Sequence, residues 1–246
     1  MKIFVFQDIH SNIDVLCNIE HLDDYKNADY RIFLGDLIGL GPDAKECVDK
    51  LMTMDTINLM GNHDYWIANH LGKRELNKCE VEKIHHVQYF RNTLDDKEID
   101  FLNSFKRDYS IEIEDKKLYF THFIWESEED TIHCHDRSNE AIFDLFKDND
   151  AKYIFYGHEH DPSVNEKDGK YLICFGSTGI IYPGYYGVIE IDNGSIILSQ
   201  KTINYDLKKI QSRIAELEYP LYKKFMGFYE YEPFVIDINE KLKNVK

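Results

Sequence analysis

Four short motifs in this chain contain side chains that can bind metal ions. In chain order they are Asp8-x-His10, Gly35-Asp36, Gly61-Asn62-His63-Asp64 and Gly157-His158-x-His160. Divalent transition metals bind well to imidazole nitrogens mixed with carboxylate and carbonyl oxygens. Together the motifs offer donors for a pair of such ions and leave one histidine over, a set suited to the hydrolysis of a phosphoester.

The donors follow segments that have the pattern of buried strands. Short apolar runs at 2–6, 31–34, 56–60, 116–121 and 153–156 each lead into a candidate donor, the fourth of them into His122. Helical spacing occurs between strands, at 13–26 and 44–52, and such alternation predicts an α/β fold. Side chains at successive strand ends are expected to meet along one edge of the sheet.

This placement suggests how the donors share two ions. Asp8 and His10 lie two residues apart where the chain leaves a strand, so both can turn toward one ion, and Asp36 is placed to bridge to a second. A catalytic site also needs open positions for water and phosphate oxygens, which seven shared ligands would leave. The other donors are Asn62, His122, His158 and His160, the last within reach of the first ion.

The motif series resembles that of the calcineurin-like metallophosphoesterase superfamily over roughly residues 2–190. The resemblance implies an α/β, four-layer α/β/β/α sandwich with two divalent metals. It implies His63 as an unligated histidine that stabilises or protonates the leaving oxygen, with Asp64 orienting it. It also implies one metal on Asp8, His10, Asp36 and His160, and the other on Asp36, Asn62, His122 and His158.

The implied reaction is attack of a metal-bridging hydroxide on phosphorus, with the two cations neutralising the developing charge. Manganese or iron is expected and zinc is possible, because mixed nitrogen and oxygen ligands discriminate poorly between metals. After Asp36 the chain reads Leu37-Ile-Gly-Leu-Gly-Pro42, without the Asp-Arg-Gly of serine/threonine protein phosphatases. That segment and Ile203-Asn-Tyr-Asp206 are similar to the small bacterial phosphodiesterases and diadenosine-tetraphosphate-type hydrolases, so the expected substrate is a small phosphodiester or a nucleotide polyphosphate.

The chain departs from the family pattern beside the predicted ligands. Gln7 and Ser11 replace a small hydroxyl residue and a glycine, and His122 is followed by Phe-Ile-Trp125 rather than a small turn. The segment 174–179 resembles the Asn-Pro-Gly-Ser element of the family but lacks its Asn-Pro. These changes remove no ligand, but they reshape the pocket.

We expect one calcineurin-like phosphoesterase domain over 1–246, with a helical insertion at 66–107 and a C-terminal helical tail at 206–246. The insertion is interpreted as two or three helices that either cap the metals or pack outside the sheet. The tail is aromatic and either packs on its own domain or contributes to a homodimer.

The composition limits the partners. With 29 Lys and Arg against 45 Asp and Glu the net charge is −16, which disfavours duplex nucleic acid and anionic membranes. Five scattered cysteines without Cys-x-x-Cys, the absence of a leader before the first strand, and no apolar run near the ~20 residues of a membrane span predict a cytoplasmic protein.

Two other functions remain open. The net negative charge argues against a nuclease of the same fold. The intact Asn62 and His63 argue against a non-catalytic scaffold. His85 and His86 are expected to be solvated or half-buried on the inserted helices. His133 and His135 lie in an acidic loop, where they either line the pocket or belong to an ordinary surface loop.

Overall fold

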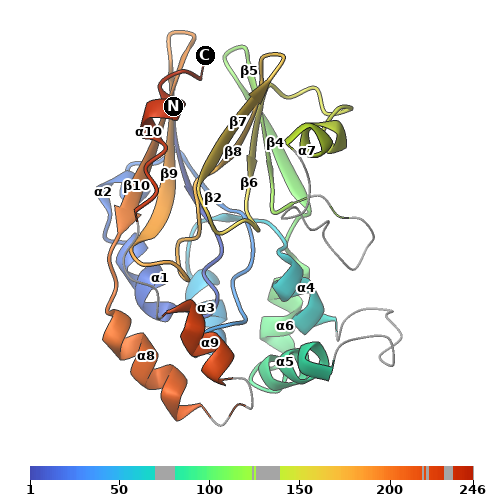
Figure 1. The fold of residues 1–246 in the computed structure, drawn as a ribbon, viewed down its shortest axis with the longest axis vertical. Helices are drawn as coiled ribbons and strands as arrows, with labels where there is room; N and C mark the ends of the chain where they lie inside the picture. Colours follow the sequence, from blue (N-terminus) through green and yellow to red (C-terminus); the bar gives the residue numbers. More distant parts are fainter. Residues whose placement is uncertain are drawn as a thin grey trace.

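The protein is built around two five-stranded mixed sheets (Figure 1). Its structure is a computed structural model that describes residues 1–69, 81–123, 125, 139–217, 219, 222–229 and 235–245. The first sheet has the order β10-β9-β1-β2-β3. Its strands are β1 (Lys2–Phe6), β2 (Tyr30–Phe33), β3 (Ile57–Asn58), β9 (Gly184–Asp192) and β10 (Ser195–Ile203).

The second sheet has the order β4-β5-β6-β8-β7. The pairs β1–β2, β2–β3, β5–β6 and β6–β8 are parallel. Antiparallel hairpins form three of the four sheet edges, and the parallel strand β3 forms the fourth. Its strands are β4 (Asp108–Ile113), β5 (Lys116–Thr121), β6 (Tyr153–Tyr156), β7 (Ser163–Lys167) and β8 (Lys170–Cys174).

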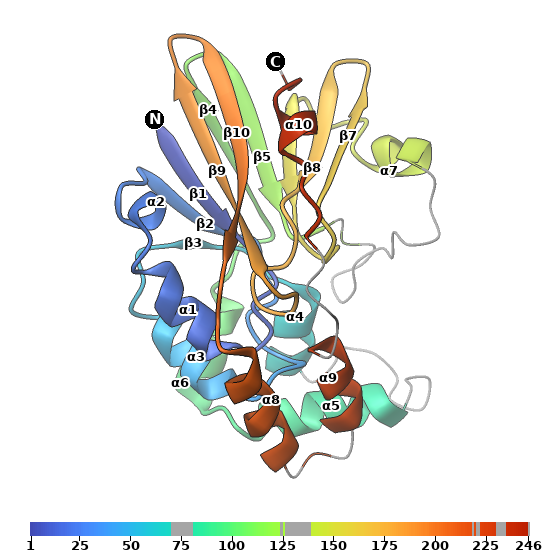
Figure 2. The ribbon, with the colours of Figure 1, turned by 60° about the vertical axis from the view of Figure 1, so that its left-hand side comes forward.

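The alternation of side chains along β1 shows how the layers form. Ile3 and Val5 point into a core shared with the second sheet, whereas Phe4 and Phe6 point into a core shared with helices. A third core, around Phe146, lies between the second sheet and α7 (Asn139–Leu145). The order helices, sheet, sheet, helix is the predicted α/β/β/α sandwich, and α7 covers the outer face of the second sheet (Figures 1 and 2).

The helix predicted over 13–26 is two helices, α1 (Ile13–Ile19) and α2 (Asp23–Lys26). The Asn12 side chain caps α1, and the chain then turns, with the Leu22 amide donating to the carbonyl of Ile19. The helix predicted over 44–52 is α3 (Ala44–Leu51).

Helices fill the described part of the region predicted as an insertion. They are α4 (Asn62–Ala68), α5 (Val81–Arg91) and α6 (Asp96–Asn103), so the first begins four residues before 66. Phe90 and Leu102 join the core on the helical side of the first sheet. The described helices therefore extend the core on the helical side of the first sheet.

The tail contains α8 (Leu207–Glu216), α9 (Tyr222–Phe228) and α10 (Asn239–Leu242). Ile210, Phe225 and Tyr229 are buried in the same core as α5, as expected for a tail that packs on its own chain. α8, α9 and α5 gather below the ends of the strands, whereas α10 lies beside β10 (Figure 2). Among the described helices, none combines the length and apolarity needed to cross a bilayer.

Candidate metal centre

The predicted ligands lie where the strands end, on backbone that turns sharply. Asp8, His10, Asp36 and His158 have φ angles of 51°, 48°, 58° and 70°. Residues with a Cβ are uncommon in this left-handed region, and such strain concentrates at functional sites. Loop-to-loop hydrogen bonds fix the turns, for example from the His10 amide to the Asp36 carbonyl at 3.0 Å.

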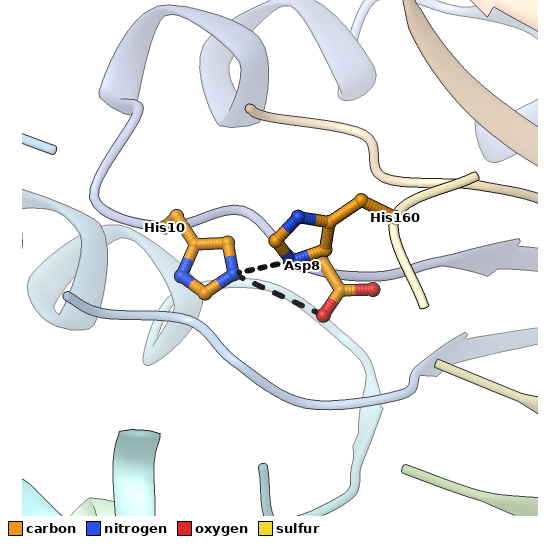
Figure 3. A group of neighbouring side chains, drawn as sticks. All are labelled: Asp8, His10 and His160. Atoms are coloured by element: carbon orange, nitrogen blue, oxygen red, sulfur yellow. Dashed lines mark hydrogen bonds and ion pairs between the residues drawn. The ribbon is translucent and has the colours of Figure 1, made fainter. Parts of the chain in front are cut away.

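One group of donors contains Asp8, His10 and His160, which converge in Figure 3. The Nε2 atom of His10 lies 3.1 Å from Nε2 of His160 and 4.0 Å from a carboxylate oxygen of Asp8. Asp8 and His10 are fully buried. Imidazole nitrogens that face each other this closely are suited to sharing one cation.

A second group contains Asp36, His122 and His158. The side-chain oxygen of Asn62 lies 3.0 Å from His122 Nε2 and 2.9 Å from His158 Nδ1, so Asn62 belongs to the same group. The Nδ1–H of His122 donates to the carbonyl of Leu34 at 2.9 Å. This bond fixes the ring with Nε2 directed into the group, which is the orientation that a metal ligand requires.

Asp36 connects the two groups. Its Oδ2 atom lies 3.7 Å from His10 Nε2 and 3.5 Å from His122 Nε2, while its Oδ1 accepts the backbone N–H of His63 at 2.9 Å. Burial raises the pKa of Asp36, but His122, His63 and His10 together bring that pKa well below its usual range. An ionised carboxylate between two ligand groups has the position of a metal bridge.

The surroundings of the Asp8 carboxylate indicate whether these residues could hold cations. Neither of its oxygens accepts a hydrogen bond of ordinary geometry from the described residues, although both are buried. Burial consequently raises its pKa well above the usual range. A buried carboxylate without donors is strongly unfavourable unless it binds a cation, so the donor set fits divalent metal ions.

Glycines allow the ligand loops to touch. A Cβ on Gly61 would lie 2.1 Å from both the amide nitrogen and Oδ1 of Asp36. A Cβ on Gly35, where φ is +102°, would lie 2.6 Å from the Gly61 nitrogen and 2.9 Å from His122 Nδ1. The glycines of these two motifs are therefore required by the close approach of the loops.

The expected role of Asp64 needs correction. Its carboxylate accepts the backbone N–H groups of Asp36, Leu37, Ile38 and Gly61 at 2.8 to 3.2 Å, rather than a bond from the His63 ring. Asp64 is the third residue of α4, so its side chain turns back toward the helix start and the neighbouring loop. It positions the loop that carries Asp36.

The side chain that meets the His63 ring is His86. Nδ1 of His63 lies 3.1 Å from Nε2 of His86, which is 7% exposed. The expectation of a solvated or half-buried side chain was therefore wrong for His86, while its neighbour His85 is exposed. The helical phase contained the signal, because His86 lies four residues before the buried Phe90.

The segment that lacks Asn-Pro still supports the site. The Ser177 hydroxyl donates to the Asp8 carbonyl at 2.8 Å, and the Ser177 amide donates to the His160 carbonyl at 2.8 Å. The side-chain Nε2 of Gln7 donates to Cys174 Sγ at 3.2 Å. His133 and His135 lie outside the described residues.

Two mixed sheets between helices, with carboxylates and imidazoles buried at the strand ends, define the class of metal-dependent phosphoesterases. The family model for the calcineurin-like phosphoesterase superfamily domain matches residues 1–194. The chain therefore belongs to the calcineurin-like phosphoesterase superfamily, a superfamily of phosphoric ester hydrolases.

The chain is also similar to individual proteins over most of its length. An uncharacterized protein of Methanocaldococcus jannaschii is 29% identical over 234 residues, which cover 91% of this chain and 90% of that protein. A metallophosphoesterase from Sphaerobacter thermophilus matches with a TM-score of 0.68 at 20% identity, covering 93% of this chain and 98% of that one. A hypothetical protein from Pyrococcus horikoshii matches with a TM-score of 0.75 at 16% identity, covering 93% and 97%. The two structures share the fold.

Proposed function

We propose that this protein is a two-metal phosphoesterase that hydrolyses a small phosphodiester or a nucleotide polyphosphate. The observation that carries the proposal is the position of Asp36, whose Oδ2 lies within 3.7 Å of one ligand group and 3.5 Å of the other. The buried Asp8 carboxylate, which accepts no hydrogen bond of ordinary geometry from the described residues, adds a second reason to expect cations there.

Two divalent metals in the proposed site, manganese or iron by preference and zinc as a possibility, would supply positive charge for the phosphate oxygens and lower the pKa of water. Asp36 would be shared between them, and Asn62 contributes an uncharged oxygen. His63 donates a proton to the leaving oxygen, which metals cannot do. The ligands of the first would be Asp8, His10 and His160, and those of the second Asn62, His122 and His158.

Two features favour a small substrate. Residues 37–42 contain no arginine that could clamp a phosphate monoester from the Asp36 loop. The net charge of −16 opposes a long polyanion such as duplex nucleic acid.

We also propose a cytoplasmic location. Cys47 and Cys174 are buried free thiols, and such thiols suit a reducing compartment.

The test is hydrolysis of bis(p-nitrophenyl) phosphate, followed by a panel of dinucleoside polyphosphates, with metal content measured on the purified protein. We expect about two ions per chain and activity that is abolished by a chelator and restored by manganese. Asp36→Asn should lose activity on the order of 10³-fold, because the shared carboxylate is removed. Asp115→Asn is the control, since that carboxylate is 80% exposed and pairs with Lys116.

An inactive wild type, or an Asp36→Asn variant as active as the Asp115→Asn control, would sink the proposal. Bound metal without hydrolysis of any substrate would favour the scaffold, and release of nucleotides from single-stranded DNA or RNA would favour the nuclease.

A further inference from the structure

The His63 ring has a neighbour that comes from a different helix. His63 is the second residue of α4, and His86 lies in the middle of α5. Their rings meet edge to face with centroids 5.1 Å apart, and Nδ1 of His63 lies 3.1 Å from Nε2 of His86. This distance corresponds to a hydrogen bond in which one nitrogen carries the proton and the other accepts it.

Gly39 provides the space for this pair. A Cβ at residue 39 would lie 2.8 Å from Nδ1 of His63 and 3.2 Å from Nε2 of His86. The φ of Gly39 is +92°, a backbone conformation that disfavours residues with a Cβ. A side chain at residue 39 is therefore disfavoured by its backbone angle as well as by the two close contacts. The loop after Asp36 thus lies directly against the His63–His86 pair, and the glycine at residue 39 leaves room for both rings.

Aromatic side chains fix the His86 ring from two sides. Phe90, on the same helix, lies at 4.9 Å between centroids, and Phe225 of α9 lies at 5.7 Å. Burial, and then the nearby His63, hold the pKa of His86 well below its usual range. An uncharged imidazole keeps one nitrogen lone pair, so His86 can accept a hydrogen bond.

We propose that His86 is a positioning residue for His63. Nε2 of His86 accepts a hydrogen bond from Nδ1–H of His63 and thereby holds the His63 ring in place. Nε2 of His63 is then the nitrogen that faces the substrate, on the side where His63 approaches Asp36 and His10. The proton given to the leaving oxygen departs from Nε2 of the doubly protonated ring, which returns to the neutral Nδ1–H form, so the Nδ1–H bond to His86 persists throughout. A third group that orients the proton-transferring imidazole is a general device of enzymes. This inference rests on the proposed phosphoesterase function.

The kinetic test compares His86→Phe, His86→Gln and His85→Phe. Phe fills the space but cannot accept a bond, whereas the Gln side-chain oxygen can accept the Nδ1–H. We expect His86→Phe to lower kcat by about 10- to 100-fold with KM changed less than about threefold, the scale seen when an orienting partner is lost. His86→Gln should recover much of that loss. His85→Phe, on the adjacent exposed position, should match the wild type.

A spectroscopic test needs neither metal nor substrate. Long-range ¹⁵N–¹H spectra of the histidine rings in the metal-free protein should show His63 with its proton on Nδ1, with the His63→Ala variant identifying the signals. In His86→Phe these shifts should move toward those of a mixture of tautomers, while in His85→Phe they should not change.

The inference is overturned if His86→Phe retains wild-type kcat, or if Gln and Phe reduce kcat equally while the His63 shifts stay unchanged. If the wild type itself is inactive, the proposed function fails instead, and the ring spectra alone decide whether His86 holds His63.

Discussion

The ligand cluster at the strand ends and the helical side behind it are assembled in different ways. In the cluster, every donor lies within four residues of the end of a strand or at the start of α4, and short loops bring the donors together. On the helical side, the rings of His63, His86 and Phe225 meet although their helices are far apart in sequence. The comparison teaches that the candidate metal ligands are encoded locally, whereas the orientation of His63 depends on how helices pack.

The two regions also differ in what stabilises them. The cluster buries carboxylates and imidazoles, and the Asp8 carboxylate accepts no hydrogen bond of ordinary geometry from the described residues, so bound cations should stabilise the cluster. The helical side buries aromatic rings such as Phe90 and Phe225, whose burial is favourable without any ligand. Removing metal should therefore affect mainly the cluster, and truncating an aromatic ring should affect mainly the helical side.

After Asp36→Asn, the largest effect on activity is expected from Asp8→Asn, which reduces the charge of one candidate ligand group. Activity should fall on the order of 10²–10³-fold, as when a group that stabilises transition-state charge is lost. Manganese at 100 times its Kd stabilises a protein by about 2.7 kcal/mol, so the wild-type Tm should rise by about 5–10 °C.

The manganese-induced rise should be smaller in Asp8→Asn, and thermal melts with and without metal measure it. An equal rise in Tm in both proteins would show that Asp8 is not a ligand. It would also remove the proposed difference between a metal-stabilised cluster and a helical side stabilised by aromatic packing.

A smaller effect is expected from Gly61→Ala, which pushes apart the loops of the cluster. The added Cβ would overlap Asp36 at 2.1 Å, so we expect a loss of about 1–3 kcal/mol in the free energy of unfolding. Activity should fall by up to about 10²-fold through misplacement of ligands. Denaturant titration and initial rates provide the measurements.

Gly227→Ala is the matched control, because this glycine is inside α9 and a Cβ added to it would meet no described atom within 4 Å. Alanine there should stabilise the protein by about 0.5–1 kcal/mol. If Gly61→Ala behaves the same way, the close approach of the two loops is not essential.

The smallest effect on activity is expected from Phe225→Ala, which removes one of the rings that fix His86. Stability should fall by about 3–5 kcal/mol, as for other buried phenylalanines. At a temperature where the variant remains folded, kcat should fall by about threefold to tenfold, less than in His86→Phe, because the Phe90 contact remains.

Phe105→Ala provides the comparison, since that buried ring packs on Phe33 and Phe101. Its stability loss should be similar and its kcat unchanged. Equal losses of kcat in both variants would mean that general loosening, rather than the contact with His86, explains the effect.

The contrast also explains what the sequence could predict. β1 and β6 were predicted with their bounds, because an apolar run before a polar donor is a local signal. The donors could be found for the same reason. β7 was missed because Ser163-Val-Asn-Glu-Lys167 is a polar edge strand with little apolar alternation.

Contacts between distant segments were harder to predict. The helical phase placed His86 near Phe90, but only the fold brings α5 against α4 and thereby His86 against His63. Asp64 was assigned to the ring beside it in sequence, whereas its position in the first turn of α4 directs it to backbone N–H groups. Adjacency along the chain was a poor guide to which groups touch.

The antiparallel pairing of β1 with β9 has a consequence for how the chain folds during synthesis. Lys2 lies opposite Glu190, and the terminal amine donates to the carbonyl of Ile191. Until the ribosome has produced β9, β1 has β2 on one side and an open edge on the other. Exposed apolar edges invite pairing with other chains. We therefore expect nascent chains that stop before residue 184 to need chaperone protection, although they already carry every ligand of the site.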